Sequence, residues 1–453
     1  MRRLREMAER NQALLANAGS MVGATVVTSL LGVAFWFVAA QHFSQAAVGV
    51  AGAAVSAMLL LGFVASLGLG TLLMGELPRR VGSQRSLLNA ALIVATASGL
   101  VGGLAFALIA PLISPNLSPL DETGLAVVAF ALATGLTALA YVLDQSLIGM
   151  LRGGLQLSRN VVFAAVKLGG LLVIAGLVAD PGAAWIYTSW GAGIAISLVV
   201  LVRFHLARSG EEELRPDFAS LRAMRGAAAS HAVVNLALES ADLAMPIIVV
   251  SLLTPAQNAG FYMAWLVVGF LVMVPLSLSS VAYALDSGET VAEVTDPVEG
   301  VVHAVEPGPP EEAGDRFRFT LAASFVFGVA ATIVLIPGAE LILKIFGSGY
   351  AETATTALRV MTLGVFPLIV KTHYIAIHRA RRTLRRALPL AWAGTLLELG
   401  GGALGAALGG IDGVAWGWVA GLVIEAIVMA PDVFGGRLGS PPRPARSSNR
   451  VAP

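Results

Sequence analysis

The chain alternates between long apolar runs and short polar connections over nearly its whole length. A helix needs about 20 apolar residues to cross the roughly 30 Å hydrocarbon core of a bilayer, and twelve of the runs reach that length. The predicted spans are residues 16–40, 46–75, 86–112, 123–149, 157–178, 183–204, 228–253, 258–284, 317–343, 354–377, 386–409 and 412–432. The pattern therefore predicts an all-α polytopic membrane protein with about twelve transmembrane helices.

Arginine is concentrated in alternate connections, which supports the number of spans independently. It occurs near the N-terminus and in the segments 79–85, 152–159, 203–225, 316–318, 379–386 and 437–450. The connections between them, residues 41–45, 114–122, 180–183, 254–258, 347–352 and 409–413, contain none. By the positive-inside rule, both termini are predicted to lie in the cytoplasm. The first apolar run is too long for a signal peptide, so we expect it to be an uncleaved span.

The spans divide into two sets of six that resemble each other in hydropathy. The stretch AAVGVAGAAVSAMLLLGF from Ala46 matches QNAGFYMAWLVVGFLVMV from Gln257 in hydropathy and turn position, with Gly49 opposite Gly260. Because both sets begin on the same side, we predict two six-helix lobes related by a pseudo-two-fold axis along the membrane normal. The predicted divisions are an N-terminal lobe of residues 1–208, a cytoplasmic linker of residues 209–227 and a C-terminal lobe of residues 228–433.

Two cytoplasmic segments have compositions that are unsuited to packing. Residues 286–315 are rich in acidic residues, Gly and Pro and contain neither Lys nor Arg, while residues 434–453 are rich in Pro, Arg and Ser. Such segments bury too little apolar surface to offset the entropy of ordering them. We predict that both are disordered.

Composition excludes several classes of protein. A hydrophobic content of 57%, a charged content of 13% and a mean hydropathy of +0.80 exclude a soluble globular protein. The absence of cysteine excludes disulfides, thiolate metal sites and a cysteine nucleophile. The sequence has no phosphate-binding loop, no HExxH motif and no extramembrane segment long enough for a domain. We therefore expect neither an enzyme nor a nucleic-acid partner, since the net charge of +1 gives no indication of one.

The seventh span carries the most informative polar residues. Glu239 and Asp242 lie about one helical turn apart near its middle, and Pro246 follows four residues after the second acid. A carboxylate in hydrocarbon costs roughly 2.5 to 3.5 kcal/mol on insertion scales, so such residues mark functional sites by default. Because Pro246 has no N–H group, it leaves the carbonyl oxygen of Asp242 free for another donor.

Other charged residues are predicted within the membrane. Lys167 and Glu398 lie near the midplane, whereas Asp144, Lys371 and Glu425 lie nearer the cytoplasmic side. Two interpretations remain open. In one, Lys167 forms a structural ion pair with an acid of the seventh span. In the other, these groups line a hydrated cavity in which a cation attracts an anionic substrate and a carboxylate binds a coupling proton or sodium ion.

Three stretches carry a resemblance to a known family. They are NAGSMVGATVVTSLLGVAFWFVAAQHFSQAAVGVAGAAVSAMLLLGFVASLGLGTLL from Asn17, DQSLIGMLRGGLQLSRN from Asp144 and NAGFYMAWLVVGFLVMVPLSLSSVAYA from Asn258. They resemble the polysaccharide biosynthesis proteins, the Wzx-like flippases of the multidrug/oligosaccharidyl-lipid/polysaccharide (MOP) superfamily. The resemblance implies a transporter of the bacterial cytoplasmic membrane whose lobes open alternately to either side. It would move polyprenyl-diphosphate-linked oligosaccharide outward, among membrane lipids and beside glycosyltransferases or a polymerase of the same pathway.

On this reading the charged residues receive hypothetical roles. Lys167 and Lys371 would attract the diphosphate, with Asp144 in the same cavity, and Arg152 and Arg159 would guide the headgroup at the cytoplasmic mouth. Glu239, Asp242 and Glu398 would bind a coupling proton or sodium ion or pair the lobes, and no other cofactor is expected. The midplane set contains more acids than bases, unlike the cation-lined cavity that the resemblance implies.

Two alternatives differ in class. One is an ion-coupled drug or organic-cation antiporter of the multidrug and toxin extrusion (MATE) branch, which shares the architecture. The other is a scaffold of a cell-envelope complex that uses the acidic segment 286–315 as its contact.

Overall fold

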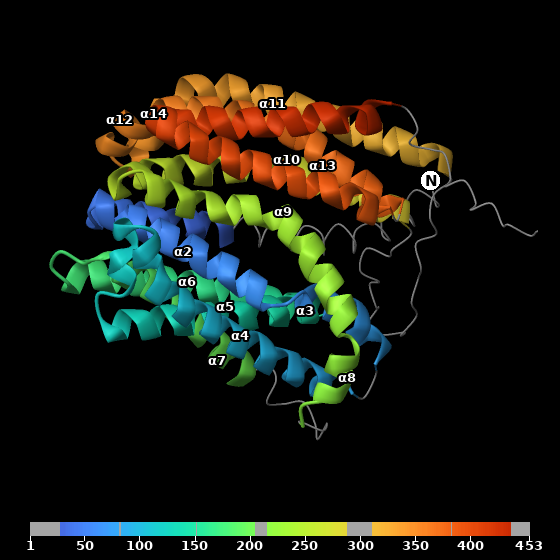
Figure 1. Cartoon of the computed structure of the whole chain (residues 1–453), viewed down its shortest axis with the longest axis horizontal. Helices are drawn as coiled ribbons and strands as arrows, with labels where there is room; N and C mark the ends of the chain where they lie inside the picture. Colours follow the sequence, from blue (N-terminus) through green and yellow to red (C-terminus); the bar gives the residue numbers. More distant parts are fainter. Residues whose placement is uncertain are drawn as a thin grey trace, which may run out of the picture.

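The computed structural model describes residues 28–80, 83–150, 152–203, 215–287, 310–381 and 383–435. Within these ranges the chain is built from helices, which form two groups on either side of the molecule (Figure 1). The helices up to α7 make one group and α10 to α14 the other, while α9 lies between them (Figure 1). The expected all-α membrane fold is confirmed.

The first group contains the helices of the first half of the chain. Residues 28–42 are helical and contain the described part of the first predicted span, residues 28–40. The others are α2 (Gln45–Ala65), α3 (Leu69–Glu76), the short 3₁₀ helix η1 (Leu77–Arg79), α4 (Gln84–Ile113), η2 (Pro115–Leu120), α5 (Gly124–Gly149), α6 (Gly153–Leu177) and α7 (Ala183–Leu201).

The second half begins after the linker. Its helices are α8 (Phe218–Ala223), α9 (Arg225–Leu252), α10 (Pro255–Ser287), α11 (Pro310–Phe346), α12 (Ser348–Leu363), α13 (Val365–Ala380) and α14 (Leu384–Phe434). Nine of the described helices are long and apolar enough to cross a membrane, or ten if α12 and α13 are one span bent by 43°. The helix α14 contains both of the last two predicted spans, which meet at non-helical backbone at Gly409 and Gly410.

Glycines spaced four residues apart bring the two parts of α14 close together. A Cβ atom added at Gly405 would lie 1.9 Å from the carbonyl oxygen of Gly413, and one added at Gly417 would lie 1.9 Å from that of Gly401. No side chain fits in either gap. The four-residue spacing of these glycines places them on one face of each helix and so allows this close packing.

The second predicted span, residues 46–75, is not continuous as expected. It breaks between α2 and α3, where Leu67 and Gly68 have φ angles of 53° and 73°. The physical reason is a close approach to α9, because a Cβ atom at Gly68 would lie 2.3 Å from the Ala228 carbonyl oxygen. Only glycine combines this left-handed conformation with so little space.

Most of the side-chain hydrogen bonds between the two halves lie on one side of the molecule, at the connections that contain no arginine. We call this the arginine-free side and the opposite one the arginine-rich side. The bonds run from Gln41 Nε2 to the carbonyls of Ile345 (3.1 Å) and Phe346 (3.2 Å), from Asn116 Nδ2 to those of Val250 and Leu253 (both 2.9 Å), and from Asn258 Nδ2 to that of Gly49 (2.7 Å). Asn258 is fully buried, so its bond to Gly49 closes a packed interface between α2 and α10.

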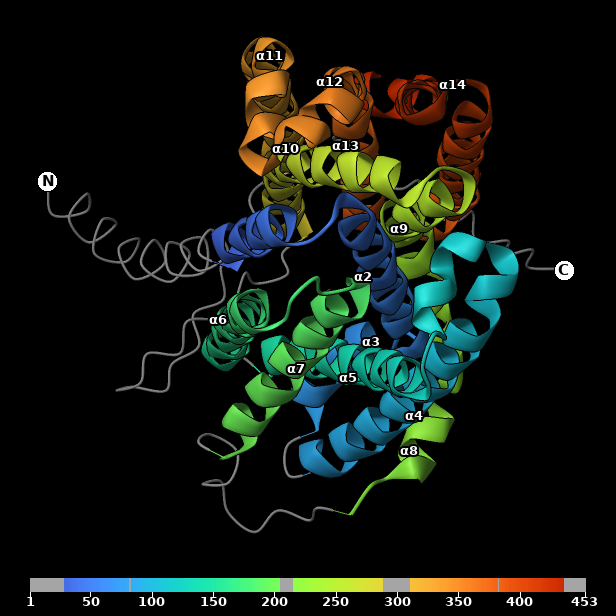
Figure 2. The same cartoon turned by 90° about the vertical axis from the view of Figure 1, so that its left-hand side faces the viewer.

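The helix α9 contacts both halves (Figure 2). Towards the arginine-rich side it packs on α3, where Asn235 Nδ2 donates to Thr71 Oγ1 at 2.7 Å. Near its middle, Ala237 accepts a hydrogen bond of 2.8 Å from Thr395 Oγ1 of α14. A displacement of α9 therefore changes contacts in both groups of helices.

Some predicted features fall wholly or partly outside the described residues. The segment 286–315 is described only at its ends, where α10 reaches Ser287 and α11 already begins at Pro310. That start lies inside the segment predicted to be disordered, so the prediction is too long at this end. Residues 436–453 are not described. The linker 209–227 contains α8, whose start is capped by a hydrogen bond from the Ser220 amide to the Asp217 carboxylate at 2.9 Å.

Candidate functional site

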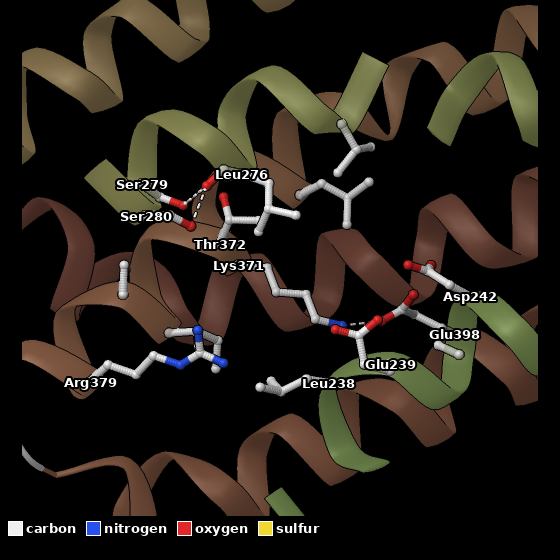
Figure 3. A pocket seen from close by; sticks show the side chains of 15 residues that line it. Leu238, Glu239, Asp242, Leu276, Ser279, Ser280, Lys371, Thr372, Arg379 and Glu398 are labelled. Carbon is white, nitrogen blue, oxygen red and sulfur yellow. Dashed lines mark hydrogen bonds and ion pairs between the residues drawn. The ribbon is translucent and has the colours of Figure 1, made fainter. Parts of the chain in front are cut away.

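The acids of α9 face a cavity within the second half of the chain. Glu239 and Asp242 are both exposed, and both line this cavity, which encloses about 180 Å³ (Figure 3). Further lining side chains come from α9 itself and from α10, α13 and α14. The acids are therefore open to the cavity rather than sealed in a packed pair, as the hydrated-cavity interpretation requires.

A buried ionic cluster forms one wall of the cavity. Lys371 Nζ of α13 lies 2.5 Å from Glu398 Oε1 and 3.2 Å from Glu425 Oε2, both on α14. Glu398 and Glu425 are each only 1% exposed and Lys371 is 9% exposed. Two carboxylates thus share one ammonium group, and the cluster has a formal charge of −1 when all three groups are ionised. A buried charge is costly without a partner, so this excess favours binding of a proton or cation.

Space for Glu425 is provided by a glycine. A Cβ atom at Gly394 would lie 2.0 Å from Glu425 Oε1, so only glycine at this position allows the carboxylate to lie beside Lys371. Apart from the contact with Lys371, both Glu425 oxygens are buried without a hydrogen-bond donor. This carboxylate therefore has unused acceptor capacity that a proton or cation could satisfy.

Two tryptophans connect the cluster to α9. Trp418 Nε1 donates a hydrogen bond of 3.1 Å to Glu398 Oε2, and the Trp418 ring packs edge-on against Trp265 with centroids 4.9 Å apart. Trp265 Nε1 in turn donates to the backbone oxygen of Asp242 at 3.2 Å. This is the carbonyl that Pro246 leaves without a helical partner, so the sequence-based expectation of a free acceptor there is confirmed.

Hydroxyl groups add further acceptors to the cavity wall. Ser279 and Ser280 both donate to the Leu276 carbonyl, and Thr372 donates to that of Ile369. Since each hydroxyl has already used its hydrogen, it offers only lone pairs to a ligand.

Arg379 is the donor at the arginine-rich end of this cavity (Figure 3). It is exposed and lies in the last turn of α13. Among the described residues, no carboxylate forms an ion pair with it. Its guanidinium group therefore remains available for an anionic group of a ligand.

The ion pair between Lys167 and an acid of α9, one of the two interpretations left open by the sequence, is not present among the described residues. Lys167 is 4% exposed and lies in the first half of the chain, where its ammonium group is 3.5 Å from the centre of the Trp190 ring. The rings of Phe163 and Phe35 lie 4.6 and 5.2 Å away. No described carboxylate pairs with Lys167. Cation–π contacts replace the predicted salt bridge because aromatic side chains of three different helices surround the amine.

Asp144 and Arg159 form a structural ion pair in the first half. Arg159 Nε donates to Asp144 Oδ1 at 2.7 Å, and Arg159 Nη2 contacts the second carboxylate oxygen. Asn160 and Ser197 accept further hydrogen bonds from the guanidinium group. The charges compensate each other, which leaves little of Arg159 for a ligand. Arg152, at the start of α6, is exposed on the arginine-rich side.

The predicted candidates are therefore divided between two places. Glu239, Asp242, Glu398 and Lys371 come together in the second half, while Lys167, Asp144, Arg159 and Arg152 lie in the first half. The sequence-based site set lacks Glu425, Arg379, Trp265 and Trp418. Glu425 has a visible signal, an acid inside an apolar run, but its position along the helix predicts a level nearer the cytoplasmic side than that of Glu398. The tryptophans carry no such signal, because an indole in a transmembrane span is not unusual.

Comparison with solved structures places this fold among known transporters. The lipid II flippase MurJ in an inward closed conformation has a TM-score of 0.67 at 11% identity, covering 90% of this chain and 86% of that one. This chain shares its fold with that protein over most of both lengths. An inward-facing multidrug resistance MATE transporter of the MOP superfamily has a TM-score of 0.63 at 14% identity, covering 91% and 96%. A MOP transporter from Pyrococcus furiosus, described as having a binding pocket of reversed polarity, has a TM-score of 0.58 at 14% identity, covering 92% of both chains. No protein-family model and no curated protein matches the sequence.

Proposed function

We propose that this protein is an ion-coupled, alternating-access transporter that flips a polyprenyl-diphosphate-linked oligosaccharide or related glycolipid for cell-surface polysaccharide biosynthesis. It would act in a bacterial cytoplasmic membrane with both termini in the cytoplasm, beside glycosyltransferases or a polymerase of the same pathway. The observation that carries the substrate class is the exposed Arg379 guanidinium, which forms no ion pair with a described carboxylate and lines the cavity. A diphosphate accepts several charge-assisted hydrogen bonds from such a group.

The hydrogen bonds on the arginine-free side support the alternating-access part of the proposal. If the positive-inside rule holds, this side is the outer one, and the protein is closed to the outside. The bonds join side-chain amides of one half to backbone carbonyls of the other, so they break together when the halves separate. An interface that opens and closes as a unit would supply the two discrete arrangements that alternating access requires.

The proposed coupling site is the ionic cluster together with the acids of α9. It consists of Lys371, Glu398, Glu425, Glu239 and Asp242. When all five groups are ionised their formal charge is −3, and Arg379 compensates only one of these charges. Binding of a proton or a sodium ion reduces the excess. The ion would bind when the cavity is open to one side of the membrane and leave when it is open to the other.

A second candidate is an organic-cation antiporter, because acceptors outnumber donors in the cavity. The carboxylates of Glu239 and Asp242 and the hydroxyls of Ser279, Ser280 and Thr372 offer only lone pairs when the acids are ionised. This lining suits a ligand that carries a positive charge.

Binding measurements on the purified protein in nanodiscs distinguish the two candidates. The probes are an undecaprenyl-diphosphate-linked sugar and tetraphenylphosphonium, and the variants are Arg379→Gln and Glu239→Gln. Hydrogen bonds to charged groups contribute about 1.5 to 3 kcal/mol, so Arg379→Gln is expected to weaken binding of the lipid-linked sugar roughly 10- to 100-fold. The exposed Arg385→Gln is the matched control, because Arg385 does not line the cavity.

The flippase proposal fails if Arg379→Gln leaves binding of the lipid-linked sugar unchanged. Saturable binding of tetraphenylphosphonium that is lost in Glu239→Gln, without binding of the lipid-linked sugar, would establish the antiporter instead.

A further inference from the structure

We propose that Trp418 and Trp265 are positioning residues that transmit the charge state of Glu398 to the proline hinge of α9. The inference rests on the proposed ion coupling and adds the residues through which binding of the ion would move the two halves. Neither indole lines the cavity, so their role does not depend on direct contact with the substrate.

The first step is the contact between Trp418 and the ionic cluster. Trp418 is 1% exposed and donates its only hydrogen-bonding proton to Glu398 Oε2, while Lys371 occupies Oε1 of the same carboxylate. An ionised carboxylate accepts a stronger hydrogen bond than a neutral one. A proton or cation that binds at Glu398 therefore weakens the hydrogen bond that this carboxylate accepts from the Trp418 indole.

The charged surroundings of Glu398 come from three helices. Lys371 lies on α13, Glu425 on the second part of α14, and Asp242 and Glu239 on α9. The acids outnumber the single lysine, so added positive charge relieves repulsion within the cluster. The Trp418 indole contacts this cluster through Glu398.

The second step connects Trp418 to the break between α12 and α13 and to the proline of α9. Its ring lies against Gly364, where a Cβ atom would come within 2.7 Å of it, and Gly364 is the break between α12 and α13. Its other neighbour is Trp265, which donates to the Asp242 carbonyl that Pro246 leaves free. Bends at prolines are places where a helix changes its angle with little loss of hydrogen bonding.

The third step is the position of α9 itself. On the arginine-rich side of Pro246, Asn235 is bonded to Thr71 of α3. On the arginine-free side, the Val250 carbonyl accepts the hydrogen bond from Asn116. A change in the bend at Pro246 moves one of these contacts relative to the other. A change in the angle of α9 at Pro246 would therefore shift the contact between Val250 and Asn116, which helps to close the arginine-free side.

The test measures closure of the arginine-free side as a function of the coupling ion. The protein has no cysteine, so His42→Cys and Glu352→Cys can carry spin labels without a background signal. Both positions are exposed and lie near the arginine-free ends of different halves. Electron–electron distance measurements in nanodiscs, at a series of pH values and sodium concentrations, give the ratio of the closed to the open population.

In the otherwise unsubstituted labelled protein, we expect the ion to change this ratio 5- to 150-fold, the usual range for coupling between two sites. Trp418→Phe keeps an aromatic ring at this position but removes the N–H donor. In this variant, and in Glu398→Gln, the ion should change the closed-to-open ratio by only about twofold or less. The double variant should lose no more than either single variant. Trp416→Phe is the matched control, because Trp416 is 57% exposed and two residues from Trp418 on the same helix.

Each outcome decides between the proposals. If the labelled parent protein does not respond to protons or sodium, the proposed ion coupling is wrong. If the parent responds and Trp418→Phe responds equally, only the tryptophan connection is overturned. If Trp418→Phe does not fold, Trp265→Phe decides the question from the α9 end, with the same expected loss of response and the same refuting result.

Discussion

Replacing Gly49 by alanine should prevent closure of the arginine-free side. A Cβ atom at this position would lie 1.8 Å from the Pro255 carbonyl oxygen. To reach the 3.4 Å of an ordinary contact, α2 and α10 must separate by about 1.6 Å. The hydrogen bond from Asn258 to the Gly49 carbonyl, 2.7 Å long, cannot survive such a shift.

The energetic cost follows from these two contacts. Overpacking a close interface costs typically 1 to 3 kcal/mol, and the lost hydrogen bond adds about 1 kcal/mol. A total of roughly 2 to 4 kcal/mol corresponds to a change of about 30- to 1,000-fold in the equilibrium between closed and open states. This is enough to make the open form predominant if the parent protein favours the closed form by a few kcal/mol.

Spin labels at His42→Cys and Glu352→Cys provide the assay. In Gly49→Ala the distance distribution should shift towards longer values, and transport should fall because one of the two states is lost. Gly102→Ala is the matched control, since Gly102 has no atom within 4 Å of an added Cβ. An unchanged distance distribution in a folded Gly49→Ala protein would refute the assignment of this interface as a closing contact.

Three further substitutions test the charged residues. Gly394→Ala should displace the carboxylate of Glu425, since the new methyl group would lie 2.0 Å from its Oε1 atom, and transport should lose most of its dependence on protons or sodium in a gradient assay. Arg159→Met leaves Asp144 without its buried partner and should lower the free energy of unfolding by about 3 to 5 kcal/mol, measured by denaturant titration in detergent. Lys167→Met loses only cation–π contacts, worth roughly 0.5 to 2 kcal/mol, so the same titration should show a clearly smaller loss.

These predictions have internal controls. Gly400→Ala should leave the ion dependence intact, because an added Cβ atom at Gly400 meets nothing within 4 Å. The comparison of Arg159 with Lys167 fails if the two methionine variants are equally destabilised. That result would mean that Lys167 has an ionic partner of the same strength as Asp144.

The local features of α9 follow from the sequence. Glu239, Asp242 and Pro246 lie in one apolar run, and the missing N–H of the proline is a covalent fact that holds in any fold. A free carbonyl at Asp242 was therefore predictable. That Trp265 of the next helix donates to it was not, since the rotation of α10 about its axis depends on packing along its whole length.

The sequence did not reveal which charged residues of different helices would pair. Depth along a span can be estimated from residue number, but depth does not tell which helices are neighbours. Lys167 and the α9 acids have similar predicted depths, yet the lysine lies among aromatic rings of the first half. Lys371 and Glu425, predicted nearer the cytoplasmic side, instead meet Glu398, because tilted and broken helices bring different residue numbers to one level.

The structural role of a glycine could be predicted from the sequence where glycines repeat at regular spacing, but not where a single glycine allows a helix to break. The four-residue spacing between Gly401 and Gly417 indicates packing whatever the partner. Gly68 and Gly364 belong to no four-residue glycine repeat, and no local pattern marks the helix breaks at these positions.

The most direct test of the central claim is movement of lipid-linked sugar in proteoliposomes under an imposed ion gradient. With the purified protein and an undecaprenyl-diphosphate-linked oligosaccharide, a proton or sodium gradient should drive the sugar to the opposite leaflet, measured by its accessibility to a membrane-impermeant glycosidase. In Glu398→Gln the gradient should have no effect on the rate. Gradient-driven accumulation of tetraphenylphosphonium, with no movement of the lipid-linked sugar, would contradict the account.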